Sequence, residues 1–551
     1  MTNLTVIPLG GYGEFGKNCT VLKYGDDLLV IDVGLMFPKD DMPGVDLVIP
    51  DFSYLVSHRD QIRGIIFTHG HEDHIGAVPY LLAQIPAKLY ATPLTRALIE
   101  SKLREDHLLT NAEINTMLPG QEIVLGQFRV TPYHVNHSIP DAVGLAIRTP
   151  LGLVVHTGDF KIDHTPIEGK TIDLGALAKL SNEGVLLLLS DSTNAESIGY
   201  TASESKLLDS LQRVFGHAQG RIIVATFASL ISRMQLVLQI AAQYGRKVAI
   251  AGRSMEEAIN ISEKLGYIRF PANTRIPITQ INSLPPQEVC ILATGSQGEP
   301  NAALARMAKG RFRNLTISPG DTVVYSSKAI PGNETAIYRN IDLLFSLGAD
   351  VIYGEQAGLH VSGHAAQEEL KLILNLLRPL YFVPIHGATR MLYRHAQLAH
   401  SMGFSPEDVF VLENGHTIDL NTSGAKLGEV IPLNTVYVDG SLVGDVGSSV
   451  LRDRLTLAQD GFVIAKVSID GTTGRITNQP ELISQGFVWQ PTSGELVRLA
   501  QDAIIGTVGR GNGGNKVSAD LLAQRIKDSL ERLFYNETKR RPMVIPMIIE
   551  S

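Results

Sequence analysis

The sequence predicts a multidomain α/β protein in which one domain is interrupted by a second. Three observations lead to this prediction. Short apolar runs, which usually form buried strands, repeatedly end in histidine or aspartate. From about residue 206 to 358 strands and helices alternate regularly, as in a separate domain with a mainly parallel sheet. Histidine-bearing strand ends return after residue 359, which indicates that the second domain is inserted into the first.

The composition is that of an ordinary globular chain. The chain has 551 residues, which is too many for a single hydrophobic core, so we expect about two to four domains. No segment approaches the roughly 18 apolar residues of a membrane span, and residues 1–5 lack a secretory signal pattern, so we expect a cytoplasmic protein without a membrane partner. Cys19 and Cys290 lie in apolar runs and are expected to be buried thiols. The net charge of −8 argues only weakly against nucleic acid, because a cleft needs only a local positive lining.

The amino-terminal segment is expected to form strands joined by a glycine turn. Residues 11–16 match the GxGxxG fingerprint of dinucleotide sites, but that fingerprint requires a helix directly after it. Residues 18–24 are rich in β-formers instead, so we expect no dinucleotide. The strand at 28–31 ends at Asp32, which either hydrogen-bonds a metal ligand or is a plain turn residue.

Residues 68–77 read THGHEDHIGA and directly follow a short apolar run. Three histidines and one aspartate should therefore lie at the carboxyl end of a strand, where the chain turns into a helix. His69 and His71 point the same way in extended backbone, whereas Asp73 and His74 can face a second point. The cluster could serve two metal ions. Histidine and carboxylate ligands without thiolate suit zinc or manganese.

Later strand ends supply more groups of the same kind. The full set of expected metal ligands is His69, His71, Asp73, His74, His137, Asp159 and His386. These seven groups suit two ions with five or six ligands each, one carboxylate being free to bridge. The neighbouring His134, His156 and His360 are expected to pack or to support ligands rather than to bind metal.

The inserted domain is predicted from strands at 222–227, 247–251, 289–294 and 322–325 and helices at 232–244, 255–265 and 334–347. We expect the first domain at residues 1–205 and 359–440, the inserted domain at 206–358, a glycine- and serine-rich linker at 441–455 and a small α+β domain at 456–551. Trp489, the only tryptophan, is expected in a core or an interface.

The HxHxDH motif at residues 69–74, with Asp32 before it and His137, Asp159 and His386 after it, resembles the metallo-β-lactamase fold, a four-layered αββα sandwich. The resemblance implies that His69, His71 and His137 hold one ion. Asp73, His74 and His386 would hold the other, and Asp159 would bridge them.

The long insertion makes the resemblance more specific. Asp191, His364 and His386 match the three extra motifs of the β-CASP subgroup, whose members cut nucleic acids. The strings GGYGEFGKN, HSIPD, TFAS and GSQGEP are similar to those of the bacterial ribonuclease J family, over about residues 4 to 440. The carboxyl-terminal hundred residues fit that family's extra domain in size and place.

The resemblance implies a two-metal ribonuclease that acts in mRNA decay and rRNA processing. It would have 5′ to 3′ exonuclease activity that favours 5′-monophosphorylated single-stranded RNA, and it would also have endonuclease activity. A hydroxide bridging the ions would attack the phosphodiester and leave 5′-phosphate products. Asp191 and His364 would protonate the leaving oxygen, and Asp73 is counted with them among the catalytic groups. A homodimer or homotetramer through the carboxyl-terminal domain and RNA-decay partner proteins are also implied.

Turns at strand ends could bind the 5′ phosphate through amides and hydroxyls. The residues expected there are Ser229, Ser296, Ser362, Gly363 and His364. Ser229 and Ser296 could instead be turn residues that satisfy their own backbone. Phe37 could stack on a base or pack structurally.

Other functions stay open on the sequence. A metallo-hydrolase for small esters or thioesters shares the fold but needs neither the insertion nor Asp191 and His364. A non-catalytic RNA-binding scaffold would place no demand on Asp159 or His386. DNA is a further substrate to test, and the ligand types do not separate zinc from manganese.

Overall fold

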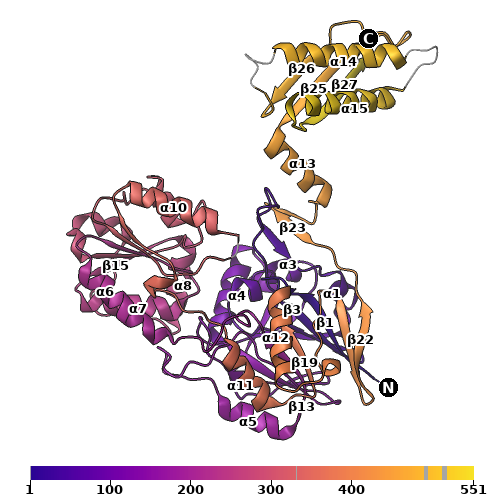
Figure 1. Cartoon of the computed structure of the whole chain (residues 1–551). Coiled ribbons are helices and arrows are strands. Elements are labelled where there is room, and N and C mark those ends of the chain that lie inside the picture. Colours follow the sequence, from indigo (N-terminus) through magenta and orange to yellow (C-terminus); the bar gives the residue numbers. More distant parts are fainter. Residues whose placement is uncertain (1, 331, 489–493, 512–517, 551) are drawn as a thin grey trace. The chain divides into compact units, whose positions relative to one another are not determined.

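The computed structural model describes residues 2–330, 332–488, 494–511 and 518–550 (Figure 1). These residues form two compact units, Met1–Phe37 with Val48–Val436 and Pro38–Leu47 with Tyr437–Ser551. Trp489 lies outside the described residues. Within the described ranges, no helix is both long and apolar enough to cross a bilayer.

The first domain contains two sheets that pack face to face. The eight-stranded sheet has the order β22 (Gly424–Val430), β21 (His416–Asn421), β1 (Leu4–Gly10), β3 (Cys19–Tyr24), β4 (Asp27–Ile31), β6 (Ile62–Ile66), β7 (Lys88–Ala91) and β8 (Glu113–Thr116). The six-stranded sheet has the order β19 (Tyr381–Ile385), β13 (Val185–Asp191), β12 (Leu153–His156), β11 (Val143–Arg148), β10 (Phe128–His134) and β9 (Ile123–Leu125). Val6 and Ile31 from one sheet share a buried cluster with Leu145 and Leu187 from the other.

Helices cover the outer sides of both sheets. Helices α5 (Leu174–Glu183), α11 (Gln367–Leu377) and α12 (Thr389–Ser401) bury their apolar faces on the six-stranded sheet. Helix α4 (Pro93–Glu105) packs against β7 and β8 of the other sheet. The four-layered αββα sandwich predicted from the sequence is therefore confirmed.

Parallel pairing brings the strand ends that carry polar residues to common edges. Strands β4 and β6 are parallel neighbours, with Ile31 beside Ile66, so Asp32 and the THGHEDH loop leave the sheet together. Strands β12, β13 and β19 are also parallel, with Asp191 beside Ile385. Asp191 is the last residue of β13, and the chain continues from β12 and β19 into Asp159 and His386 at the same edge.

The inserted domain is a parallel sheet with helices on both faces. Its order is β15 (Lys247–Ala251), β16 (Val289–Ala293), β14 (Ile222–Ala225), β17 (Thr322–Tyr325) and β18 (Asp350–Ile352). Helices α6 (Leu207–His217), α7 (Ile231–Gln243) and α8 (Arg253–Lys264) cover one face, and α9 (Ala303–Ala308) and α10 (Glu334–Ser346) cover the other. The expected alternation is present, and β18, α6 and α9 are additional.

The second unit contains a three-stranded sheet, β26 (Glu481–Gln485), β25 (Phe462–Ile469) and β27 (Met543–Glu550), with helices α13 (Ser448–Asp460), α14 (Gly494–Gly511) and α15 (Ala519–Thr538). Burial alternates along β25, so one face of the sheet packs on α14 and α15.

The stretch expected to be a linker, residues 441–455, instead contains β24 (Leu442–Val443) and the first half of α13. Gly447 precedes this helix, and Leu451 and Leu455 are spaced to lie on one helical face. The glycines and serines therefore mark the start of a helix. Residues Pro38–Leu47 also belong to this unit, which no local sequence pattern indicates.

Candidate metal centre

The first group of candidate ligands comes from three segments of the first domain. His69 Nε2 lies 3.0 Å from His71 Nδ1, which lies 3.1 Å from His137 Nε2. Asp159 Oδ2 is 3.6 Å from His69 Nε2 and 3.7 Å from His137 Nε2. One ligand atom from each of these four residues lies within 4.8 Å of the others.

The second group shares Asp159 with the first. His74 Nε2 is 3.2 Å from His386 Nε2, and Asp73 Oδ2 is 3.4 Å from the same His386 nitrogen. Asp159 Oδ2 lies 3.0 Å from His386 and 3.3 Å from His74. The seven side chains selected from the sequence thus form two adjacent groups around one carboxylate.

The outward nitrogens of four of these imidazoles already have partners, which directs their other nitrogens inward. The partners are Gly363 O for His137 Nδ1 at 2.8 Å, Asp32 Oδ2 for His74 Nδ1 at 2.8 Å, Thr68 Oγ1 for His69 Nδ1 at 3.0 Å and Thr193 Oγ1 for His386 Nδ1 at 3.2 Å. Asp32 also accepts from Thr68 N and Thr68 Oγ1, both at 2.8 Å. Asp32 therefore contacts a ligand and not the centre of the site, and it also occupies a turn at φ 62°.

Burial keeps the imidazoles of the first group neutral, which favours metal binding. Burial lowers the pKa of His69 and His137 well below the usual value and lowers the pKa of His71 to about 4. These three imidazoles are therefore neutral at neutral pH, and each neutral ring has one nitrogen lone pair that can bind a metal ion. Such a set of nitrogen and oxygen donors fits a divalent metal ion.

The second group favours positive charge. Burial opposes charge on His74, but Asp159, Asp73 and Asp32 outweigh it and raise its pKa to about 10. Burial likewise opposes ionisation of Asp159, yet His386 and His74 hold the pKa of that carboxyl well below its usual range. Carboxylates that are held ionised in a buried site are also suited to a divalent cation.

Asp191 and His364 form a pair beside both groups. His364 Nδ1 lies 2.8 Å from Asp191 Oδ2, and Asp191 Oδ1 accepts from Thr193 N at 2.9 Å. Burial opposes charge on His364, but Asp191 outweighs it and raises the pKa of the imidazole. The His364 side chain is 19% exposed, whereas Asp191 is almost fully buried. A protonated imidazole with solvent access can donate a proton to a bound molecule.

The residues expected at the 5′ phosphate are only partly brought together. Ser362 Oγ accepts from Asn194 Nδ2 at 2.8 Å and from His364 N at 3.2 Å, so residues 362–364 form an ordered turn at the centre. Ser229 and Ser296 lie in loops after the neighbouring strands β14 and β16. Among the described residues, neither hydroxyl forms a hydrogen bond to that turn. Phe37 is 60% exposed, so it is not a core residue.

Several contacts were not expected from the sequence. Asn18 Nδ2 donates to Asp73 O at 3.0 Å and lies 3.1 Å from His74 Nε2. Thr193 contacts His386 and Asn194 contacts the 362–364 turn, and their place two and three positions after Asp191 is the signal that could have found them.

The backbone before the cluster also approaches it closely. Val33 N donates to His74 O at 2.8 Å, and Leu35 N donates to Glu72 O at 3.0 Å. A Cβ atom on Gly34 would lie 1.6 Å from Asp73 O, so only glycine fits between these contacts. Gly34 therefore allows this backbone to pack directly on the loop that carries Asp73 and His74.

Comparison with known protein families covers most of the chain. Residues 12–196 match the metallo-beta-lactamase superfamily, and residues 219–344 match the ribonuclease J beta-CASP domain. Residues 355–412 match the Zn-dependent metallo-hydrolase RNA specificity domain, and residues 449–551 match the ribonuclease J C-terminal domain.

Individual relatives match over nearly their full length. Ribonuclease J 1 of Streptococcus pyogenes is 42% identical over 100% of this chain and 99% of the relative, and Ribonuclease J2 of Bacillus subtilis is 41% identical with the same coverage. Ribonuclease J of Thermus thermophilus is 43% identical over 100% of this chain and 96% of its own. A crystal structure of a protein of unknown function from Enterococcus faecalis V583 aligns with a TM-score of 0.55 and 18% identity, covering 76% of this chain and 100% of that one. This last likeness shows the fold alone.

Proposed function

The chain belongs to the ribonuclease J family and is a metal-dependent ribonuclease, and we propose that it removes nucleotides from the 5′ end of single-stranded RNA. It favours a 5′ monophosphate and also cleaves internally. The observation that carries the proposal is the 2.8 Å pair of Asp191 and His364 beside two ligand groups that share Asp159. A hydrolase for small esters would have no use for that pair.

Each ligand group would hold one divalent ion, zinc or manganese. His69, His71 and His137 belong to one group, Asp73, His74 and His386 to the other, and Asp159 to both. When bound, the ions supply positive charge at the phosphate and lower the pKa of the water that serves as nucleophile.

The remaining chemistry belongs to the side chains. His364 Nδ1–H donates a hydrogen bond to Asp191 Oδ2 and keeps its proton, and the proton on Nε2 passes to the departing 3′ oxygen of the substrate. Asp191 is held in place by Thr193 N and thereby orients the imidazole. The products are a 5′-phosphorylated nucleotide and an RNA that again begins with a 5′ phosphate.

Recognition of the 5′ phosphate is assigned to residues of both domains. Ser362, Gly363 and His364 would bind the phosphate from the first domain, and Ser229 and Ser296 would bind it from the inserted domain. The hydroxyls and amides of these turns suit phosphate oxygens. The exposed ring of Phe37 would stack on a base.

The direct test uses one RNA sequence with a 5′ monophosphate, a 5′ hydroxyl or a 5′ triphosphate, together with the matched DNA. With Mn²⁺, nucleotides should leave in order from the 5′ end of the monophosphate RNA, at least about tenfold faster than from the other ends. A chelator should stop release, and Mn²⁺ or Zn²⁺ should restore it. Release from the 3′ end, equal rates on DNA, or RNA binding without cleavage would each contradict the proposal.

The second unit is assigned to assembly into a homodimer or homotetramer, in a cytoplasmic enzyme of mRNA decay and rRNA processing that works with partner proteins. Truncation after residue 445 should then lower the number of subunits, measured as solution mass by light scattering. The full chain is the reference. An unchanged number of subunits in the truncated protein would show that the second unit is not needed for oligomerisation.

A further inference from the structure

Arg233 is a fully buried arginine where the inserted domain meets the first domain. It lies in the first turn of α7, and only 1% of its surface is exposed. A buried guanidinium is tolerated only when it is paired and hydrogen-bonded. The groups that bond the two terminal nitrogens of Arg233 therefore indicate which segments this side chain holds together.

Those groups come from both segments that connect the two domains. We call residues 192–206 the outgoing crossover and residues 353–366 the return crossover. Arg233 Nη2 donates to Glu204 Oε1 in the outgoing crossover at 2.8 Å and to Val361 O in the return crossover at 3.3 Å. Arg233 Nη1 donates to Ser326 O at the end of β17 at 2.7 Å and lies 3.1 Å from His360 Nδ1. One guanidinium thus joins both crossovers to the inserted domain.

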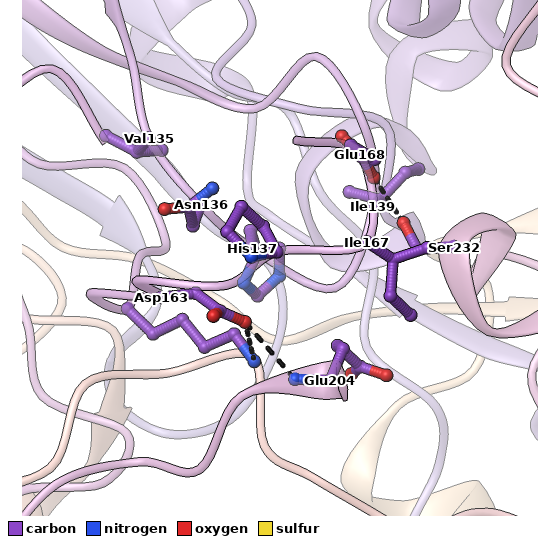
Figure 2. A pocket seen from close by; sticks show the side chains of 11 residues that line it. Val135, Asn136, His137, Ile139, Asp163, Ile167, Glu168, Glu204 and Ser232 are labelled. Carbon is purple, nitrogen blue, oxygen red and sulfur yellow. Dashed lines mark hydrogen bonds and ion pairs between the residues drawn. The ribbon is translucent and has the colours of Figure 1, made fainter. Parts of the chain in front are cut away.

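The outgoing crossover is also anchored to the first domain. Glu204 N donates to Asp163 Oδ2 at 3.2 Å, and Lys161 Nζ lies 3.4 Å from the same carboxylate oxygen. Next to Arg233, Ser232 Oγ donates to the Glu168 carboxylate. Figure 2 shows Glu204, Ser232 and Glu168 on the wall of a cavity that is also lined by His137.

The return crossover continues from Val361, which Arg233 contacts, directly into the turn at residues 362–364. Val361 immediately precedes Ser362, and Gly363 O accepts from His137 Nδ1 at 2.8 Å. His364 O accepts from Thr201 Oγ1 at 2.7 Å and from Asn194 Nδ2 at 3.0 Å, both in the outgoing crossover. The turn is therefore held between Arg233 on one side and the outgoing crossover on the other.

We infer that Arg233 is a positioning residue, which keeps the two crossovers in register so that residues 362–364 present His364 to Asp191. This inference rests on the proposed function. It requires arginine in particular, because a planar fork can bond a carboxylate and two carbonyl oxygens at once, whereas a lysine ammonium is a point charge on a flexible stem. Arg233→Lys should keep the charge beside Glu204 and lose the hold on the return crossover.

The test is a double-mutant cycle with the full chain, Mn²⁺ and 5′-monophosphorylated RNA. Arg233→Lys should lower kcat by about 30-fold or more with KM changed by less than about threefold. In a His364→Ala background the same change should lower kcat by less than about threefold, because the group it positions is gone. Metal content, measured by mass spectrometry, should equal that of the wild type.

Arg221→Lys is the matched control. Inside the inserted domain, Arg221 Nε donates to Asp321 Oδ1 at 2.8 Å and Arg221 Nη2 donates to Asp321 Oδ2 at 2.6 Å. Within the described part of the chain, Arg221 forms no hydrogen bond to either crossover. It should change the melting temperature without changing kcat. If Arg233→Lys does not melt cooperatively, Glu204→Gln takes its place in the cycle.

Three results would overturn the inference: an unchanged kcat, a loss that multiplies with the loss from His364→Ala, or an equal loss in Arg221→Lys. A wild-type chain that does not cleave RNA would instead refute the proposed function on which the inference rests.

Discussion

Replacing Asp159 with asparagine is expected to reduce RNA cleavage by at least about a thousandfold and to lower the bound divalent metal. Asp159 Oδ2 lies 3.0 to 3.7 Å from ring nitrogens of four histidines, two in each ligand group. Among the residues that the structure describes, Asp159 is the one side chain that belongs to both ligand groups. Asparagine keeps the shape but removes the charge that both groups share. Single-turnover cleavage and metal content by mass spectrometry measure the two effects.

The matched control is Asp321→Asn, which removes another buried carboxylate. Asp321 is 3% exposed and pairs with Arg221 in the inserted domain, away from the ligand groups. It should leave metal content and cleavage unchanged even where stability falls. RNA affinity of Asp159→Asn, measured by fluorescence anisotropy, should also stay within about threefold of wild type, because most RNA contacts are to the phosphate backbone. If Asp159→Asn retained both ions and cleaved RNA within tenfold of the wild-type rate, the shared role of Asp159 would be disproved.

His364→Ala should lower kcat by about a hundredfold to ten-thousandfold with a nearly unchanged KM. Among the described residues at the centre, His364 has the imidazole that combines a buried carboxylate partner, a raised pKa and a partly exposed side chain. Asp191→Asn should have a smaller effect in the same direction, since it alters the orientation and charge of the imidazole while leaving the ring in place.

A change of leaving atom separates proton donation from general damage. In RNA whose scissile bond has sulfur in place of the 3′ oxygen, the departing thiolate needs no proton, so His364→Ala should cleave it nearly as fast as the wild type. Asp159→Asn should not be rescued in this way, because its defect lies in the ligand groups. If His364→Ala lost the same factor in cleavage rate on both substrates, His364 would not be the general acid.

Local spacing in the sequence was enough to predict the histidine cluster and most of the elements that carry it. His69, His71, Asp73 and His74 lie within six positions, so strand periodicity and one turn decide where they point. The strand and helix alternation from 206 to 358 is local in the same sense, and the inserted sheet follows from it. The linker was mispredicted because glycine and serine at 447–449 mark the start of a helix as readily as a flexible segment.

The sequence by itself therefore determined the residue types of the candidate ligands, the strand ends that present them and the interrupted domain order, and the family resemblance implied how the candidate ligands divide. Only the tertiary structure decided which atoms meet. His74 and His386 are 312 residues apart and lie 3.2 Å from each other, and Arg233 joins two crossovers separated by more than a hundred residues. The fit of Gly34 against Asp73 is of the same kind. Periodicity acts over a few residues, whereas these contacts depend on how whole sheets and domains pack, and packing is a property of the complete chain.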